Sequence, residues 1–524
     1  MTTEVGIGEG EQVAAARGWA ERLDRALERR AIVVVGLALL AYGLLAAWHS
    51  ASKRIWYDEW FTYEIARLPD LGQFIRALGE GSEQTPPLDY LLSRASLALL
   101  GDGAWGLRAP SVAGVGVMLA CLYAVVARRL GPLYAWGAVL VALTGPAWFF
   151  ATEARSYALV LGFSAAALLC WQRAEPGGSR RPALAGLTFG IAGAVSSHYF
   201  ATICLIPLGL GQLVRSWRLR RVDAPAWAAL VLGGAVVLLY VPLVLQKRGF
   251  IGTFWARPAW AMLPGMYEYF IGLLAVPLAW LLVGWGAGLG RVRPPAEDSP
   301  SARASGFLVE ERAAALGFVL LPVFGLLLAK AFLGLVDGRY LITTVFGFAM
   351  LLPACIARAT RGAAAGGLAL AVVLGCWFGL DEGGKLLKAW KYPPPAPGPA
   401  AAAFFDGAGR SEPILIADEK VYFDAFHEWP ADLAARLIYV TERPPNMLDP
   451  VRLIQPFLSG VRVESIGDRE TAHQPVLVYT TLRDEVPSQA SLPALIASGA
   501  EIRLIASHGD QRLYRATWSP RDPR

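Results

Sequence analysis

The stretch that decides the fold is Ala31-Ile-Val-Val-Val-Gly-Leu-Ala-Leu-Leu-Ala-Tyr-Gly-Leu-Leu-Ala-Ala-Trp-His49, an unbroken apolar run near the start of the chain. A helix needs about 20 mostly apolar residues to cross the hydrocarbon core of a bilayer. The run also exceeds the roughly 7–15 apolar residues of a secretory signal peptide. We therefore expect an uncleaved signal anchor, preceded by a charged tail over residues 1–30.

The composition of the whole chain agrees with a membrane protein. Of its 524 residues, 55% are hydrophobic and 17% are charged, against about 25% charged in globular proteins. The mean hydropathy of +0.43 argues against a large soluble enzyme, a disordered chain and a disulfide scaffold. The net charge of +6 comes without a dense basic stripe, so we expect no nucleic-acid partner.

Ten further apolar runs follow the first one, so the sequence predicts a polytopic α-helical membrane protein with about eleven transmembrane helices. The predicted spans are residues 31–49, 109–127, 133–151, 156–172, 183–197, 199–214, 226–245, 267–290, 314–335, 340–357 and 363–380.

The distribution of Lys and Arg predicts the orientation, because these residues favour cytoplasmic loops. With the N-terminus inside, the predicted inner connections hold fifteen arginines and the short outer connections hold five cations. This ratio favours a cytoplasmic N-terminus in the cell membrane, and an odd number of spans then places the C-terminal part outside. The five outer cations run against the rule and need another explanation; they are Arg155, Lys247, Arg248, Arg257 and Arg339.

Two outer segments are long enough to carry function. Residues 50–108 form the first outer loop of a membrane module over 31–380, and they hold eight carboxylates. A Pro-rich linker over 381–399 leads to residues 400–524, where short β-branched runs alternate with helical patterns. We interpret residues 400–524 as a small extracytoplasmic α/β domain.

The sharpest local signal is Trp56-Tyr-Asp-Glu-Trp60, immediately outside the first span. Of two adjacent carboxylates near a membrane, one can act as a general base while the other orients it or binds a metal. The alternative is an aromatic belt with two solvated acids. Asp58 and Glu59 are therefore candidate catalytic residues.

Short outer turns carry a second set of candidates. Glu153, Arg155 and Tyr157 occupy one turn, where a charge is costly unless it is paired or used. An ion pair between Glu153 and Arg155 is the alternative to a site. His198-Tyr199 lies at the next outer turn, and a lone His is more often a satisfied interfacial residue than a ligand.

Further polar residues are predicted at the same membrane face. Arg339-Tyr340 and Lys247-Arg248 lie at outer helix ends, while Asp89 and Arg108 lie in the first outer loop, where a helix start and an interfacial anchor are the alternatives. This clustering indicates one outer cavity that holds an anion. Guanidinium groups suit phosphate because they offer paired hydrogen-bond donors.

The ordered set of these motifs resembles the bacterial glycosyltransferase family 39 proteins of the GT-C superfamily, which include protein mannosyltransferases and aminoarabinose transferases. The resemblance covers roughly residues 30–360. The matching motifs are Tyr57-Asp-Glu59, Thr85-Pro-Pro-Leu88, Leu107-Arg-Ala-Pro-Ser111, Glu153-Ala-Arg-Ser-Tyr157, His198-Tyr-Phe200 and Arg339-Tyr-Leu341.

The resemblance implies a GT-C fold and an inverting transferase that takes sugar from a polyprenyl-phosphate donor on the outer, periplasmic face. It implies that Asp58 deprotonates the acceptor hydroxyl or amine, with Glu59 as its neighbour and Glu153 as a second acid. The implied donor-phosphate ligands are Arg155, Arg339, Lys247, Arg248 and Tyr340. The implied substrate contacts are Tyr157, His198, Tyr199, Arg108 and Asp89.

Several alternatives stay open at this point. A divalent metal at Asp58, Glu59 and Glu153 is permitted but not required. Family members often have His or Lys where this chain has Thr85, which puts any phosphate or metal role of that position in doubt. The acceptor is a lipid, a polysaccharide or a protein. A transporter or flippase of lipid-linked saccharide with an outer accessory domain is the main rival, and a receptor without catalysis is the third possibility.

Overall fold

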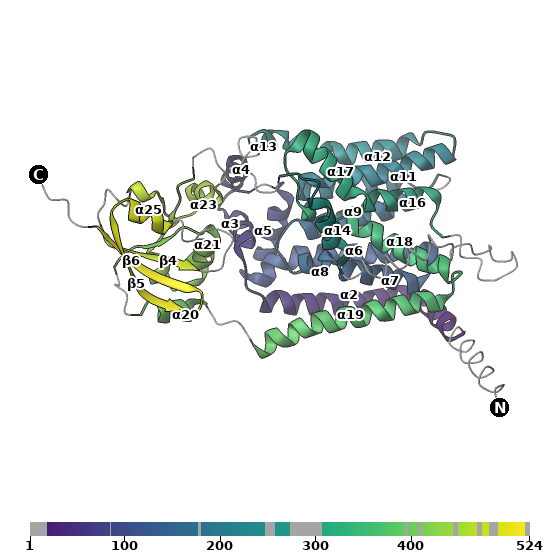
Figure 1. Cartoon of the computed structure of the whole chain (residues 1–524). Coiled ribbons are helices and arrows are strands. Elements are labelled where there is room, and N and C mark those ends of the chain that lie inside the picture. The colour runs from purple at the N-terminus through teal and green to yellow at the C-terminus, as the bar shows by residue number, and fades with distance from the viewer. Residues whose placement is uncertain are drawn as a thin grey trace, which may run out of the picture. The chain divides into compact units, whose positions relative to one another are not determined.

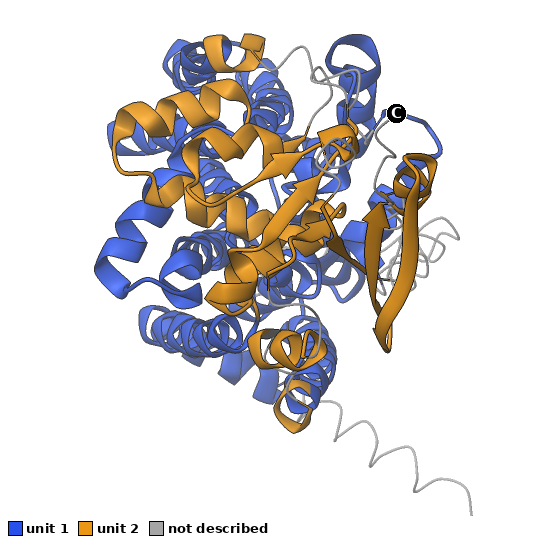
Figure 2. Cartoon of the chain, turned by 90° about the vertical axis from the view of Figure 1, so that its left-hand side faces the viewer, with its two compact units in different colours: residues 1–53, 85–241, 255–388 blue, residues 54–84, 242–254, 389–524 orange. Residues whose placement is uncertain are grey.

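A computed structural model of the chain describes residues 18–83, 85–176, 180–246, 257–272, 306–392, 397–406, 411–443, 449–468, 474–481 and 491–518. Figure 1 shows this structure, in which long helices make up most of the chain and strands occur in the C-terminal part. Contacts divide the chain into two compact units, coloured in Figure 2. Unit 1 comprises residues 1–53, 85–241 and 255–388, and unit 2 comprises 54–84, 242–254 and 389–524.

Unit 1 is a bundle of helices around an apolar core, as the hydrophobic runs of the sequence predict. Its helices before residue 205 are α2 (Ala31–Ser52), α5 (Leu88–Leu100), α6 (Ala104–Leu130), α7 (Pro132–Leu143), α8 (Pro146–Ala151), α9 (Tyr157–Arg173), α10 (Arg181–Ser197) and η1 (Tyr199–Cys204). The later ones are α11 (Leu205–Arg218), α12 (Ala224–Ala235), η2 (Val236–Tyr240), α14 (Met262–Ile271), α16 (Val309–Val319), α17 (Leu321–Leu328), η6 (Ala329–Leu333), η7 (Gly338–Leu341), α18 (Thr344–Ala359) and α19 (Ala364–Lys391); α13 (Val241–Gln246) begins in unit 1 and continues into unit 2.

Among the described residues, five helices are long and apolar enough to cross a membrane, or six if the bent pair Val309–Val319 and Leu321–Leu333 is one span. The five are Ala31–Ser52, Ala104–Leu130, Tyr199–Arg218, Ala224–Gln246 and Ala364–Lys391. Three shorter apolar helices, α7, α9 and α18, coincide with other predicted spans. Most of the predicted span 267–290 lies outside the described residues, and the count of eleven stays a prediction.

Some predicted spans are interrupted helices. The run 133–151 breaks between α7 and α8, where Pro146 occupies the first turn of the second helix and cannot donate a hydrogen bond to the first. The run 314–335 bends by 55° at a break next to Pro322. Proline explains both departures from the predicted continuous helices.

Close helix packing fixes the geometry at the end of the bundle where the outer motifs lie. A Cβ atom on Gly114 of α6 would lie 2.6 Å from the carbonyl oxygen of Ala158 on α9, so this position accepts only glycine without rearrangement. Small residues allow helices to approach closely when lipid provides no hydrophobic drive for packing. The start of α9, which carries Tyr157, is therefore held against α6.

The other end of α6 and the end of α11 form ion pairs with buried glutamates of α16. Arg129 donates to both oxygens of Glu311, at 2.8–3.0 Å, and Arg218 donates to Glu310 at 2.7 and 3.0 Å. The Glu310 and Glu311 side chains are buried, so the arginines compensate charges that would otherwise be costly. These arginines belong to the predicted cytoplasmic connections.

Unit 2 contains a six-stranded mixed sheet in the order β3-β2-β1-β4-β6-β5. Strands β1 (Ile414–Ile416), β2 (Leu437–Val440), β3 (Val463–Glu464) and β4 (Val476–Thr481) are parallel, and β5 (Ala500–His508) and β6 (Gln511–Trp518) complete the sheet as an antiparallel hairpin. Its helices are α3 (Tyr57–Arg67), α4 (Leu71–Glu80), α20 (Pro397–Phe404), α21 (Glu419–Glu428), α22 (Ala431–Ala434), α23 (Pro450–Ile454), η8 (Gln455–Phe457) and α25 (Ser491–Ala497).

The sequence of unit 2 explains its local structure. The parallel strands read as short, fully buried runs, for example Leu437–Val440, which is typical of a sheet covered on both faces. Asp418 directly after β1 accepts hydrogen bonds from the amides of Lys420 and Val421, and so begins α21. Unit 2 also includes residues 54–84, which the sequence places in the first outer loop.

Candidate functional site

Seven residues from separate segments of unit 1 lie together at one end of the bundle, and we call them the bundle-end cluster. They are Lys53, Glu153, Arg155, Tyr157, His198, Arg339 and Tyr340. Six of the seven are predicted site residues. Their segments are the end of α2, the turn before α9, the end of α10, and η7.

Aromatic rings connect three of these segments. The ring of His198 lies 5.4 Å from that of Tyr157 and 5.0 Å from that of Tyr340, between ring centroids. Phe200 adds a fourth ring, 4.8 Å from Tyr340. The guanidinium of Arg339 lies 5.9 Å from the ring centroids of both Tyr157 and Tyr340. The motifs at residues 157, 198 and 339–340 therefore form one contiguous group.

His198 is a buried, neutral imidazole in this group. Its Nδ1 accepts a hydrogen bond from the amide of Phe200 at 3.2 Å, which leaves the proton on Nε2. Burial, together with the positive charges of Arg155 and Arg339, lowers the pKa of His198 to about 3. The imidazole can thus donate a hydrogen bond from Nε2 at neutral pH, and its bonded Nδ1 is not available as a base.

Three cations belong to the bundle-end cluster, and two of them have carboxylate partners. Lys53 forms an ion pair with the Glu153 carboxylate, whose side chain is only 1% exposed. Asp337 caps η7 through the amide of Arg339, and its carboxylate lies 3.6 Å from the Arg339 Nε. Arg155 is the third cation, and its charge acts on His198. Several cations gathered in one cluster suit an anionic ligand.

Lys53 is the member of the cluster that sequence reasoning did not identify. It follows the last turn of α2, and its ammonium group also lies 4.7 Å from the ring centroid of Phe149. A Lys just beyond an apolar run reads as an ordinary membrane anchor. The only sequence signal was the unexplained buried charge of Glu153, which required a cation. The predicted alternative partner for Glu153 was Arg155.

The acidic pair 58–59 lies at the N-terminus of α3, in unit 2, and the two carboxylates have different environments. Glu59 is fully buried, and its Oε2 accepts a hydrogen bond from the amide of Trp56 at 3.4 Å, so it caps the helix. Asp58 is half-buried. Glu59 therefore stabilises the turn that presents Asp58, and only Asp58 is accessible for chemistry.

Other predicted site residues make structural contacts or lie outside the described residues. Arg108 is buried and donates to the backbone carbonyls of Ser50 and Lys53 at 2.6 and 2.8 Å, so it caps the end of α2. Asp89 is buried in the first turn of α5, and the ring of Tyr199 contacts that of Tyr240. Lys247 and Arg248 lie outside the described residues.

Thr85, the position that departs from the expected family pattern, has a local partner. Its hydroxyl lies 2.5 Å from the hydroxyl of Tyr90, and both side chains are buried.

The described residues contain no group of three or more His, Cys, Asp or Glu side chains that could hold a metal ion. Of the three predicted metal ligands, Asp58 and Glu59 belong to unit 2 and Glu153 belongs to unit 1.

We predict that His198 contributes to acid sensitivity. Its folded pKa of about 3 lies below the ordinary value of 6.5, so its contribution to stability is complete above pH 6.5 and is lost as the pH falls toward 3. His198→Asn keeps an acceptor for the Phe200 amide but has no group that titrates in this range. Unfolding midpoints of the variant, measured in detergent between pH 7 and pH 4.5, should decrease less than those of the wild type. An equal decrease would contradict the assignment of a neutral imidazole.

Comparisons with known proteins extend these observations. Residues 84–245, which include Glu153, Arg155, Tyr157 and His198, match the sequence model of a family described as dolichyl-phosphate-mannose-protein mannosyltransferase. No curated protein sequence matches the chain.

Two crystal structures of ArnT from Cupriavidus metallidurans are similar to this chain. The apo structure has 14% sequence identity and a TM-score of 0.56, and the structure bound to undecaprenyl phosphate has 13% identity and a TM-score of 0.55. Both alignments cover 93% of this chain and 98% of ArnT. The chain therefore shares the fold of ArnT over nearly its whole length, and the resemblance predicted from the sequence is confirmed.

Proposed function

We propose that this protein is an inverting membrane glycosyltransferase, which moves a sugar from a polyprenyl-phosphate donor to an acceptor hydroxyl or amine at the outer face of the cell membrane. The observation that carries the proposal is the bundle-end cluster, in which cations and aromatic rings from distant segments meet beside a neutral His198. The match of residues 84–245 to a mannosyltransferase family supports it. So does the likeness to ArnT, which was crystallised with undecaprenyl phosphate.

In the proposed reaction the acceptor oxygen or nitrogen attacks the anomeric carbon of the sugar. The bond from that carbon to the phosphate oxygen breaks, the acceptor proton passes to Asp58, and the polyprenyl phosphate leaves with the bond electrons. Arg155 and Arg339 stabilise the negative charge that develops on the phosphate. The rings of Tyr157 and Tyr340 fix the position of the Arg339 guanidinium.

The charge distribution supports an outer location for this chemistry. The arginines of the opposite bundle end, such as Arg129 and Arg218, pair with buried glutamates and match the predicted cytoplasmic connections. The bundle-end cluster then faces outward. A donor anchored by its polyprenyl chain reaches such a site laterally through the membrane.

The proposal is tested with purified full-length protein in proteoliposomes that contain a panel of undecaprenyl-phosphate sugars. Mass spectrometry should detect release of undecaprenyl phosphate that depends on an added acceptor extract. Comparison of envelope glycans and glycolipids from wild-type and deletion strains then identifies the acceptor. Movement of the lipid-linked sugar across the vesicle membrane without its transfer would overturn the proposal in favour of a flippase.

Arg339 provides a prediction on donor binding. Arg339→Ala should weaken the binding of undecaprenyl phosphate roughly 10- to 100-fold, because a hydrogen-bonded charge partner of phosphate is lost. Arg339→Lys keeps the charge without the paired donors and should give an intermediate loss. Ligand-induced stabilisation against heat, measured in detergent over a range of lipid concentrations, reports the affinity. Arg128→Ala, at the opposite end of the bundle, is the matched control, and equal affinity for Arg339→Ala and this control would exclude Arg339 from the phosphate site.

A further inference from the structure

Helix α3, whose second residue is the half-buried Asp58, is attached to the C-terminal sheet domain through α21. The indole of Trp60 stacks on the imidazole of His427 with ring centroids 4.0 Å apart and an interplanar angle of 11°. One residue further along α3, Phe61 stacks on Phe423 at 4.5 Å and 20°. Both contacts join the first turns of α3 to one face of α21.

Polar contacts reinforce this attachment before α3 and after α4. Just before the helix, Arg54 forms a two-pronged ion pair with Glu428, with its Nε 3.1 Å from Oε1. One helix later, the Ser82 hydroxyl after α4 donates to the carbonyl of Leu453 on α23 at 2.9 Å. The segment from residue 54 to residue 82 is therefore fixed to the sheet domain at several points.

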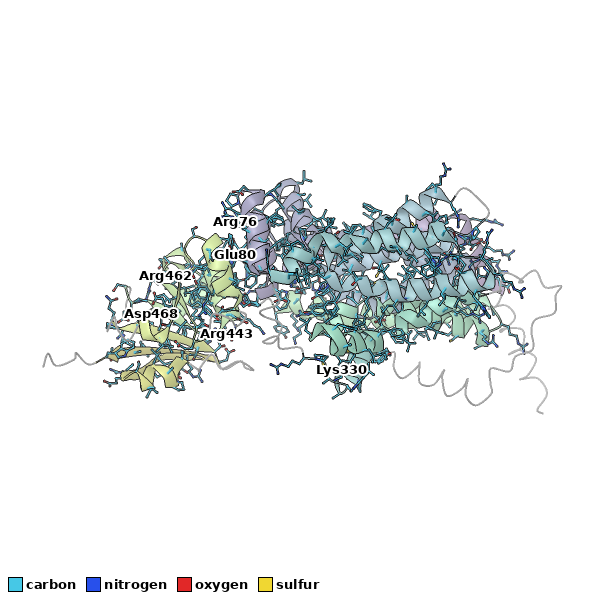
Figure 3. The ribbon with its side chains drawn as sticks, turned by 90° about the horizontal axis from the view of Figure 1, so that it is seen from above. Arg76, Glu80, Lys330, Arg443, Arg462 and Asp468 are labelled. Carbon is cyan, nitrogen blue, oxygen red and sulfur yellow. The ribbon has the colours of Figure 1, made fainter. Side chains whose placement is uncertain are left out.

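In the sheet domain, α3 begins near the edge of the sheet at which domains of this topology bind ligands. The strand order places β2 and β3 on one side of β1 and β4 on the other, so the order of the parallel strands reverses between β1 and β4. In such sheets the ligand lies outside the carboxyl ends of the parallel strands at this reversal. Residues that follow β1 and β2 here include Glu419 and Arg443, which are hydrogen-bonded to each other at 2.6 Å; Arg443 is labelled in Figure 3.

Tyr57, the first residue of α3, lies at that edge. Its hydroxyl interacts electrostatically with Glu419, Tyr439 and Arg443, and burial raises the pKa of the hydroxyl. Its ring also contacts that of Phe423 at 6.2 Å. The chain's own helix thus reaches the edge where a doubly wound domain would hold a small molecule.

We propose that the C-terminal domain is a positioning module for the catalytic helix α3, and that Phe423 and His427 are positioning residues for Asp58. This inference rests on the proposed role of Asp58 as the base. Rates of bond formation are sensitive to displacement of a reacting group, and about 1 Å of misplacement costs roughly 10²-fold. The flat stacking of Trp60 on His427 restricts how α3 can rotate or slide, and therefore where Asp58 lies.

The kinetic test compares full-length His427→Ala and Phe423→Ala with the wild type. Each variant should lower kcat for sugar transfer by roughly 10- to 100-fold, with the KM for the lipid donor unchanged within about twofold, because the donor contacts proposed above belong to the bundle-end cluster. His427→Phe retains a flat ring for Trp60 and should recover most of the lost kcat. Wild-type kcat in both alanine variants would overturn the inference while leaving the proposed function intact.

The second test does not depend on activity. Hydrogen–deuterium exchange over residues 57–67 should accelerate in His427→Ala and Phe423→Ala, while exchange in α6 and α9 stays unchanged. Leu495→Ala is the matched control. Leu495 belongs to the core of the sheet in the same domain, so its truncation creates a cavity there without removing a contact of α3 with Phe423 or His427. Protection of residues 57–67 equal to that of the wild type in both alanine variants overturns the inference. If the wild type binds lipid donors but transfers no sugar, the proposed function fails, and the exchange result still decides whether α21 holds α3.

Discussion

Asp58→Asn is expected to abolish measurable sugar transfer, with a loss of roughly 10²–10⁴-fold that corresponds to removal of a general base. Asparagine has nearly the same shape as aspartate, and Glu59 still caps α3 through the amide of Trp56. The variant should therefore fold like the wild type and bind undecaprenyl phosphate with unchanged affinity. Single-turnover transfer from a preloaded donor measures the chemical step directly.

Glu59→Gln is the control for the Asp58 experiment, because glutamine also serves at the third position of a capped helix. It removes the neighbouring charge but keeps the acceptor for the Trp56 amide. We expect its transfer rate to remain within about tenfold of the wild type. A wild-type rate in Asp58→Asn, or a larger loss in Glu59→Gln than in Asp58→Asn, would reject Asp58 as the base.

The second large effect is expected at the ion pair of Lys53 and Glu153. Lys53→Met leaves a carboxylate that is 1% exposed without its cation, which costs about 3–5 kcal/mol when a pair is deeply buried. Lys53 itself is 27% exposed, so we expect a value near the lower limit of that range. Chemical unfolding in detergent, followed by intrinsic Trp fluorescence, measures the change in the free energy of unfolding.

A double variant tests whether the cost comes from the uncompensated charge. Lys53→Met with Glu153→Gln removes both charges and should be more stable than Lys53→Met alone. Arg128→Met is the control, because Arg128 and Glu175 are each 38% exposed and such a pair contributes at most about 1 kcal/mol. Equal destabilisation by Lys53→Met and Arg128→Met would show that the ion pair with Glu153 does not support the fold.

The sequence predicted which polar residues lie together at the helix ends, but it did not predict which of them contact each other. Tyr157, His198, Arg339 and Tyr340 could be grouped because each lies at the outer end of an apolar run, and ends on one membrane face are neighbours in a bundle. The partner of Glu153 could not be chosen in this way. Arg155 is near Glu153 in sequence, but Lys53 forms the ion pair, and that choice depends on how α2 packs in unit 1.

Tertiary packing also decided the role of Arg108 and the place of α3. The guanidinium of Arg108 has the chemistry of an anion ligand, yet it caps α2 because it donates hydrogen bonds to the carbonyls of Ser50 and Lys53. The motif around Asp58 reads as part of a loop between two spans. No periodicity within residues 54–84 indicates that Trp60 and Phe61 stack on a helix near residue 425, because those contacts are set by surfaces far apart in the chain.

The ion pair between Arg54 and Glu428 joins residues 374 positions apart. At a synthesis rate of about 5–20 residues per second, roughly 20–75 s separate the translation of these two residues. During that time α3 has been made but its partner helix has not, and its aromatic side chains need protection from other hydrophobic surfaces. Packing of the segment that carries Asp58 against the sheet domain therefore waits until α21 has been synthesised.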